Sequence, residues 1–299
     1  MHPHVRNYRR VFFDVEVFLV SAQTLTLKWR NGRILNVYVY SIGMRKNNPR
    51  TTGDPVSDYN FITKRRKHMN HAILTIDDVA SKNTPAIVDY LNEKGIKAVL
   101  FATGQNVENH YEEAMYAVKH GMIVGNHSYS HPQFSKLSIP ECLEEIVKCE
   151  NVLDELYADC GVKRTVRPFR FPYGDKGGIG RPILQQYLKE NHFHKLDDSK
   201  LTYPWWKANN LHVDIDTLWS FDFAEYAIRP DSGFTKENVW ARMHDMNPRF
   251  GAALFGEGNA HILLLHAHDE TEEMLPGYYK LFLDHLLENG VIFDEPKFI

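Results

Sequence analysis

From about residue 70 onward, short apolar runs alternate with longer stretches in which apolar side chains recur every three or four residues. The runs are typical of buried strands and the stretches of amphipathic helices, so their alternation predicts a series of βα units. The expected strands span residues 72–76, 98–101, 122–125, 166–169, 213–219, 262–265 and 291–293. The expected helices span residues 84–95, 111–120, 138–157, 182–189, 235–246 and 276–289. Such repetition favours a closed α/β barrel.

The first part of the chain shows a different pattern. Its three β-type runs span residues 11–22, 24–29 and 34–40. Between the last two lies Asn31-Gly32, a pair typical of a tight hairpin turn. A polar stretch rich in Asn, Pro, Thr and Gly follows at residues 45–58. We therefore expect a small β-rich module with its linker at residues 1–58 and one large α/β domain at residues 59–299.

Residues 191–210 fit neither period well and contain Tyr203-Pro204-Trp205-Trp206. Long irregular segments in compact domains are often functional, which favours a loop that faces the substrate. A structural plug with two buried tryptophans explains the same residues, and the sequence leaves both interpretations open.

Composition restricts the class of protein. The 299 residues are 43% hydrophobic and 24% charged, with a net charge of -3, as in ordinary globular proteins, so nucleic acid is not expected as a partner. Apolar runs near the start are interrupted by Asp14 and Glu16, so no transmembrane segment is expected. No signal peptide is visible, which predicts a cytoplasmic protein, or an extracytoplasmic one if a leader has been removed. The oligomeric state stays open.

The three cysteines are too few for a dense disulfide framework. Cys142 and Cys149 lie seven residues apart on an expected helix, about 10 Å along its axis, which is too far for a disulfide bond. We expect buried thiols.

Five polar clusters follow expected strands. They are Asp77-Asp78, His127–His131, Arg170–Asp175, Asp222–Tyr226 and His266–Asp269. In a βα barrel the carboxyl ends of the strands converge on one face, where active sites form. Residues far apart in the sequence are therefore expected to meet there.

Two of these clusters contain metal-ligand residue types. In Asp77-Asp78 one carboxylate can bind a metal while the other acts as a base, although such pairs also cap helices. His127 and His131 lie four residues apart, so on a helical turn both imidazoles face one way. With one aspartate they form a set suited to Zn²⁺ or another divalent transition metal. Ordinary hydrogen-bonded histidines are the alternative.

The remaining clusters offer a cation and a proton donor. Arg170 lies among rigid prolines and can hold a fixed positive charge near a carboxylate, or form an ordinary salt bridge. His266 and His268 follow an apolar run, and either can donate a proton or be a partly exposed surface residue.

In chain order these clusters resemble the motifs of the polysaccharide deacetylases of the NodB-homology type, also called carbohydrate esterase family four. The resemblance spans about residues 70–299. The matching motifs are Thr75-Ile76-Asp77-Asp78, His127-Ser128-Tyr129-Ser130-His131, Arg170-Phe171-Pro172-Tyr173, Asp222-Phe223-Ala224-Glu225-Tyr226 and Leu264-Leu265-His266. The second motif matches the family's His-Ser/Thr-x-x-His completely and is the most specific.

The resemblance implies a distorted (β/α) barrel that hydrolyses N-acetyl groups of an N-acetylglucosamine-containing polysaccharide, peptidoglycan or chitin-like, and releases acetate. It implies that Asp78, His127 and His131 bind a divalent metal ion, zinc first, with cobalt, nickel or manganese as alternatives. It also implies that Asp77 is the general base and His266 the general acid. The expected partner is a carbohydrate polymer or oligosaccharide.

Five further residues receive roles from the same resemblance. Arg170 orients the base, and Glu225 holds Arg170. The backbone N–H of Tyr173 contributes to an oxyanion hole beside the substrate. Leu264 and Tyr226 flank the acetyl methyl group.

Departures from the family pattern leave alternatives open. Val79-Ala80 replaces the usual Gly-Pro, Glu225 is longer than the usual Asp, and Tyr226 replaces Trp. His268 is a second candidate for the general acid. The rival functions are a deacylase for another acylated substrate and a catalytically silent carbohydrate-binding homologue. A purely structural metal is disfavoured, because such sites usually have four protein ligands, often cysteines.

Overall fold

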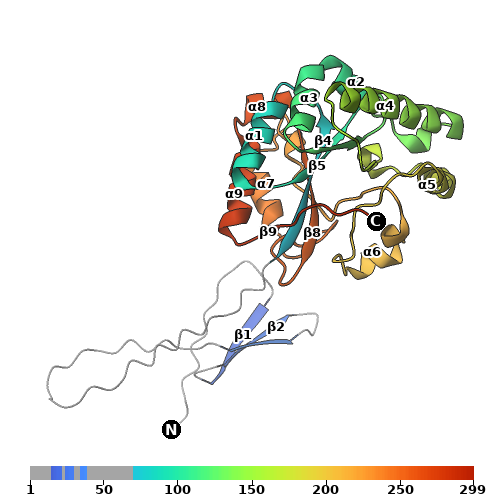
Figure 1. Ribbon diagram of the computed structural model, residues 1–299. Coiled ribbons are helices and arrows are strands. Elements are labelled where there is room, and N and C mark those ends of the chain that lie inside the picture. The colour runs from blue at the N-terminus through green and yellow to red at the C-terminus, as the bar shows by residue number, and fades with distance from the viewer. Residues whose placement is uncertain (1–14, 22–23, 30–33, 39–69) are drawn as a thin grey trace, which may run out of the picture. The chain divides into compact units, whose positions relative to one another are not determined.

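The computed structural model describes residues 15–21, 24–29, 34–38 and 70–299, and it divides the chain into two compact units, Met1–Thr63 and Lys64–Ile299 (Figure 1). The first unit contains three antiparallel strands in the order β1-β2-β3. They are β1 (Val15–Ser21), β2 (Thr24–Trp29) and β3 (Ile34–Tyr38). The three predicted strands are confirmed over these residues, whereas Asn31-Gly32 and the polar stretch 45–58 lie outside the described residues.

The second unit is built on a parallel sheet. Its strands are β4 (His71–Val79), β5 (Ala98–Ala102), β6 (Ile123–Asn126), β7 (Phe221–Asp222), β8 (Ala260–His266) and β9 (Ile292–Phe293). The order is β6-β5-β4-β8-β7, and β9 pairs with the start of β4. Because β4 is central, it is covered on both faces, as its near-continuous apolar sequence requires.

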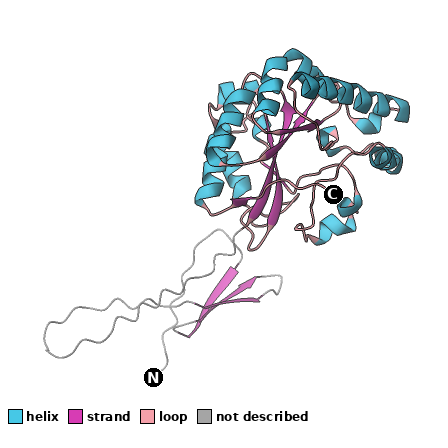
Figure 2. Cartoon of the chain, viewed as in Figure 1, coloured by secondary structure: helices cyan, strands magenta, loops and turns pink. Residues whose placement is uncertain are grey.

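Helices surround this sheet (Figures 1 and 2). They are α1 (Thr84–Lys94), α2 (Gly104–Asn109), α3 (Tyr111–Lys119), α4 (Ile139–Asp159), α5 (Arg181–Glu190), α6 (Pro204–Ala208), α7 (Lys236–Met243), α8 (Asp269–Met274) and α9 (Tyr278–Glu288). Local signals set their ends: Ser138 and Glu141 form a capping box before α4, and Gly95 ends α1 in the left-handed conformation. The six predicted helices are confirmed, whereas the short α2, α6 and α8 were not predicted.

The sheet closes into a distorted barrel through a few backbone hydrogen bonds instead of full strands. Beyond β6, Asn126 forms an isolated parallel bridge with Phe169, and the N–H of Thr217 donates to the carbonyl of Phe169. The chain then continues from Thr217 into β7, which pairs with β8. The predicted barrel class is confirmed, but the strands predicted at residues 166–169 and 213–219 are not formed.

Buried charges explain the missing strand at residues 213–219. At the start of this segment Val213 is 62% exposed, whereas Asp214 and Asp216 are buried. Both carboxylates bind the ammonium of the buried Lys176, at 2.9 and 2.6 Å. Since these ion pairs hold the segment, the acidic side chains point inward and the expected pairing is lost.

Residues 191–210 act as a plug. Trp206 is 2% exposed and packs in a core cluster with Val99, Phe101 and Ile262 of the sheet. Its indole N–H donates to Asp198 at 2.7 Å, which satisfies the one polar atom of the ring. The plug interpretation is therefore confirmed for Trp206.

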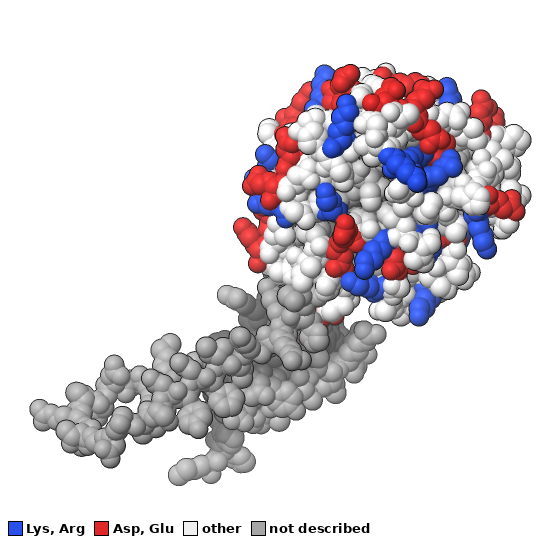
Figure 3. Space-filling model, viewed as in Figure 1, with Lys and Arg blue, Asp and Glu red and all other residues white. Residues whose placement is uncertain are grey.

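Three general features of the described chain are its lack of a membrane-spanning helix, its mixed surface charge and its free thiols. In the described part of the chain, no helix combines the length and apolarity needed to cross a membrane. Positive and negative side chains are interspersed on the face in Figure 3. Cys142 and Cys149 are buried and Cys160 is partly buried, all as free thiols, which confirms the prediction for the first two.

Candidate active site and metal centre

The carboxyl ends of β4, β6 and β8 bring the predicted clusters together. Asp77 on β4 is in register with His266, the last residue of β8. His127 directly follows β6, and its N–H donates to the carbonyl of Ala102 at the end of β5. The convergence predicted from strand order is thus confirmed for these side chains.

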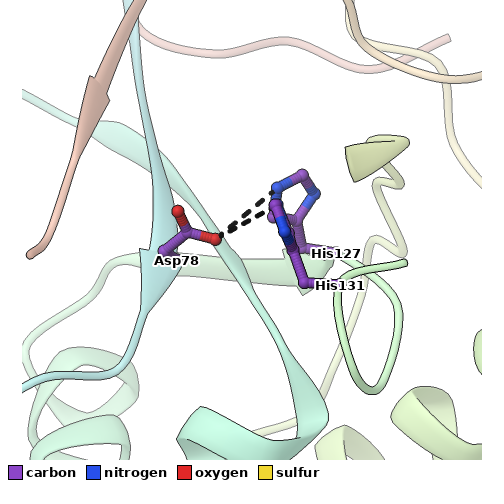
Figure 4. Close-up of side chains that lie close together, drawn as sticks. All are labelled: Asp78, His127 and His131. Carbon is purple, nitrogen blue, oxygen red and sulfur yellow. Dashed lines mark ion pairs between the residues drawn. The ribbon is translucent and has the colours of Figure 1, made fainter. Parts of the chain in front are cut away.

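Asp78, His127 and His131 form one three-donor cluster (Figure 4). Asp78 Oδ1 lies 3.4 Å from His131 Nε2 and 3.9 Å from His127 Nε2. Two ligands bonded at about 2.0–2.1 Å in a tetrahedral zinc site lie roughly 3.4 Å apart, so this set fits a divalent transition metal. Two imidazoles and one carboxylate also leave positions open for water and substrate.

The two histidines reach this cluster from a loop, not from the helical turn that their spacing suggested. Ser128 and His131 have φ angles of 65° and 59°, which end any helical path. The buried Asn126 holds the loop by accepting from the N–H of Ser128 at 2.8 Å. His127 Nδ1 donates to the carbonyl of Arg170 at 2.8 Å, so its Nε2 is left as the metal-binding atom.

The protonation states suit metal binding. Burial, with the nearby charge of His127, lowers the pKa of His131 to about 4, so the imidazole is neutral at pH 7. Burial raises the pKa of Asp78, but the hydrogen bond from His268 and the adjacent histidines outweigh it and hold that pKa well below its usual range. A neutral imidazole and an ionised carboxylate are the forms that bind metals.

Asp77 is buried and locked by Arg170. Arg170 Nη1 donates to Asp77 Oδ1 at 2.6 Å and to Thr75 Oγ1 at 2.8 Å. The fully buried guanidinium lies over Phe101 and near Trp219, with its carbon 4.4 and 5.4 Å from their ring centroids. Because Oδ1 is engaged, Oδ2 faces the metal cluster, 3.4 Å from His127 Nε2.

The structure corrects the predicted partner of Glu225. Its Oε1 accepts from the backbone N–H of His266 at 2.6 Å and lies 3.2 Å from His266 Nδ1. Arg170 Nη2 and Glu225 Oε2 are both buried without a partner in the described chain, so Glu225 does not hold Arg170. The reason is the turn after β7, where Ala224 has a φ angle of 56° and places Glu225 beside the end of β8.

The contact between Glu225 and His266 also changes the pKa of His266. Burial lowers the pKa of His266, but the carboxylate of Glu225 outweighs it and raises that pKa to about 9. His266 is therefore protonated at pH 7. Asp222 completes this second cluster of possible donor atoms, and burial raises its pKa to about 6.

Residues 64–189 match the family model described as polysaccharide deacetylase. This stretch is therefore similar to the polysaccharide deacetylase family. Members of the family are metalloenzymes, and the three-donor cluster in this domain is a candidate site for the ion.

Curated relatives are about one-third identical to this chain over the residues that they match. A peptidoglycan-N-acetylglucosamine deacetylase of Bacillus cereus is 34% identical over 119 residues, 39% of this chain and 38% of that protein. The peptidoglycan-N-acetylmuramic acid deacetylase PdaC of Bacillus subtilis is 35% identical over 147 residues, 48% and 28%. Chitin deacetylase 1 of Cryptococcus neoformans is 34% identical over 113 residues, 38% and 23%. The matched region thus spans well under half of each relative.

The fold agrees with a solved member of the family. The crystal structure of the Bc1960 peptidoglycan N-acetylglucosamine deacetylase superposes with a TM-score of 0.53 and 20% identity, over 77% of this chain and 87% of that one. This similarity supports the family's distorted barrel and carries no information about substrate.

The residues predicted to contact substrate border both clusters. The ring of Tyr173 lies 4.5 Å from that of His131, and the ring of Tyr226 lies 4.7 Å from that of His266. Both tyrosines are exposed, as a substrate surface requires. Leu264 is buried on β8, two residues before His266 and hence on the same face of the strand. The roles of these residues, including the oxyanion N–H of Tyr173, stay predictions.

Two residues that contact this site, Arg229 and Thr75, were not predicted from the sequence. A cavity of about 400 Å³ opens beside the metal cluster, and Arg229 and His268 line it together with Asp78. His268 was predicted only as a second candidate acid, and nothing in the sequence pattern singled out Arg229. Thr75, which accepts from Arg170, is the first residue of the Thr-Ile-Asp-Asp motif and could have been found there.

Proposed function

We propose that this domain is a metal-dependent hydrolase that removes N-acetyl groups from an N-acetylglucosamine-containing polysaccharide. One observation carries the proposal: a three-donor cluster lies beside a carboxylate that an arginine holds in place, and a protonated histidine is in register with that carboxylate on the next strand. The carboxylate is Asp77 and the histidine is His266. A base, a metal site and an acid within one strand-end cluster are the parts that amide hydrolysis needs.

Asp78, His127 and His131 would hold the ion. Zinc fits two imidazoles and a carboxylate best, although cobalt, nickel and manganese accept similar sets. When bound, such an ion polarises the acetyl carbonyl and lowers the pKa of the attacking water.

The protein's own residues would move the protons. Asp77 Oδ2 accepts a proton from the water while the water oxygen bonds to the acetyl carbon. Arg170 keeps the carboxylate of Asp77 oriented. His266 holds Glu225 through Nδ1, so its Nε2–H is free to protonate the sugar nitrogen. The carbon–nitrogen bond then breaks and leaves acetate and an amine. The N–H of Tyr173 would stabilise the oxyanion formed before that step.

The names of the relatives support the substrate class. The three relatives described above are deacetylases of peptidoglycan or chitin, polymers that share N-acetylated amino sugars. The two exposed tyrosines at the site suit such a ligand, because sugars bind readily against aromatic rings.

The test is acetate release by the purified chain, loaded in turn with Zn²⁺, Co²⁺ and Ni²⁺, from N-acetylglucosamine oligomers and from peptidoglycan. Asp77→Asn is the matched variant, because the amide keeps the side chain's shape and removes the base. We expect metal-dependent release that falls by about 10²–10⁴-fold in the variant.

The other outcomes separate the rivals. Metal binding with no acetate from either polymer, but turnover of another acylated compound, would replace the polysaccharide with that substrate. Metal binding and sugar binding without turnover of any substrate would refute the proposed enzymatic activity and favour a carbohydrate-binding protein.

A further inference from the structure

A second chain of hydrogen bonds, which does not include Arg170, reaches the metal cluster. His268 Nε2 lies 2.7 Å from Asp78 Oδ2, and His268 Nδ1 lies 3.0 Å from Arg229 Nη2. Arg229 Nη1 in turn donates to Thr271 Oγ1 at 2.9 Å. These four side chains form a line that ends on a carboxylate of the candidate metal site.

The arginine decides which nitrogen of His268 carries the proton. A guanidinium only donates hydrogen bonds, so His268 Nδ1 must accept from Arg229. In the neutral imidazole the proton then lies on Nε2, which donates to Asp78 Oδ2. The direction of every hydrogen bond in the line follows from this one constraint.

The hydrogen bond from His268 gives the two oxygens of Asp78 different neighbours. Oδ2 is occupied by His268, whereas Oδ1 is the oxygen near both imidazoles, at 3.4 and 3.9 Å. Among the described residues, His268 donates to the Asp78 carboxylate and no backbone N–H does. The orientation of this carboxylate therefore depends on side chains, and the Nδ2 of Asn106 binds only the backbone carbonyl of Asp78.

We propose that His268, with its tautomer set by Arg229, is a positioning residue that presents Asp78 Oδ1 to the metal ion. The inference rests on the proposed function, because it takes Asp78, His127 and His131 as the ligands. Partners that hydrogen-bond to a metal ligand fix its orientation and raise its affinity for the ion.

The same geometry distinguishes His268 from a general acid. Its Nε2–H is directed at Asp78 and its Nδ1 at Arg229, so neither nitrogen has a proton to deliver to a leaving group. His266 differs, because only its Nδ1 is engaged by a side chain. The two histidines, whose ring centroids lie 5.3 Å apart, thus have separate tasks.

The experiment measures affinity for Zn²⁺ and Co²⁺ by competition with a chromogenic chelator, independently of catalysis. His268→Ala removes the donor, and His268→Gln keeps an N–H at about the same position. His110→Ala is the matched control, because His110 lines the same cavity but, among described residues, forms no hydrogen bond with the three ligands. Unfolding midpoints without metal establish that each variant is folded.

We expect His268→Ala to weaken metal binding by about 10–100-fold, the range usual for such partners. His268→Gln should restore most of the affinity, and His110→Ala should leave it unchanged. Arg229→Met should cause a smaller loss, because the imidazole can then adopt either tautomer. The visible spectrum of bound Co²⁺ should change in His268→Ala, since one ligand is no longer held.

Two results would overturn the proposal. Unchanged metal affinity in His268→Ala, with or without lost turnover, would show that His268 does not position Asp78. Equal weakening in His110→Ala would show that any change in the cavity has the same effect. If the unaltered chain bound no metal at all, the proposed function would fail together with this inference, whereas unchanged affinity in an active enzyme would refute the inference alone.

Discussion

Replacing Glu225 with glutamine should shift the pH dependence of the reaction. The side chain is fully buried, and its Oε1 accepts from the N–H of His266. The amide oxygen of glutamine can keep that hydrogen bond, so Glu225→Gln removes one negative charge with little change in shape. Without the charge, the largest effect that raises the pKa of His266 is gone, and only the smaller effects of Asp77 and Asp78 still oppose the burial that lowers it.

The size of the effect follows from the change in pKa. His266 must be protonated to act as the acid, so activity falls as pH rises through its pKa. With a pKa of about 9, roughly nine-tenths of His266 is protonated at pH 8. With a pKa near the ordinary value of 6.5, that fraction is about 3%. We therefore expect kcat at pH 8 to fall by about 30-fold, and much less at pH 6.

The assay is acetate release at saturating substrate and metal between pH 5.5 and 10. The basic limb of the kcat profile should move down by at least two pH units in Glu225→Gln. Glu270→Gln is the control, because this exposed residue lines the cavity and loses the same charge. Its profile should match that of the unaltered protein.

A basic limb that stays near pH 9 in Glu225→Gln would refute the reasoning, because His266 would then not be the acid or Glu225 would not set its pKa. A uniform loss of activity at all pH values would also contradict it, since that result indicates a purely structural role.

Three other predictions concern stability, metal and thiols. Arg170→Ala should lower the free energy of unfolding by about 3–5 kcal/mol in guanidinium chloride, because Asp77 is left buried and unpaired; a loss under 1 kcal/mol would contradict this. Removing metal with a chelator should abolish acetate release and added Zn²⁺ should restore it, whereas turnover in the chelated protein would disprove metal dependence. Cys160 should react first with a thiol reagent, and Cys142 and Cys149 only after denaturation, as peptide mapping can determine.

Local patterns predicted most of the longer elements and the position of candidate site residues at strand ends. Apolar runs of four or five residues located β4, β5, β6 and β8, because buried parallel strands need nearly continuous apolar sequence. The rule that active sites form where parallel strands end then placed Asp77, Asp78 and His127 correctly.

The strand prediction failed where charged side chains are buried. Residues 213–219 were predicted as a strand, but Lys176 draws Asp214 and Asp216 inward, and no local pattern reveals a partner some forty residues away. The four-residue spacing of His127 and His131 suggested a helical turn, although a loop with left-handed residues places both on the same cluster.

The sequence by itself determined the βα repetition, the family resemblance and the residue types at each strand end, because these depend on neighbours within a few positions. Only the tertiary structure decided the partners. Glu225 pairs with His266, 41 residues away, instead of Arg170, and His268 binds Asp78 across 190 residues. Hydrogen-bond partners depend on how distant turns aim their side chains, and that geometry arises only when the whole barrel closes.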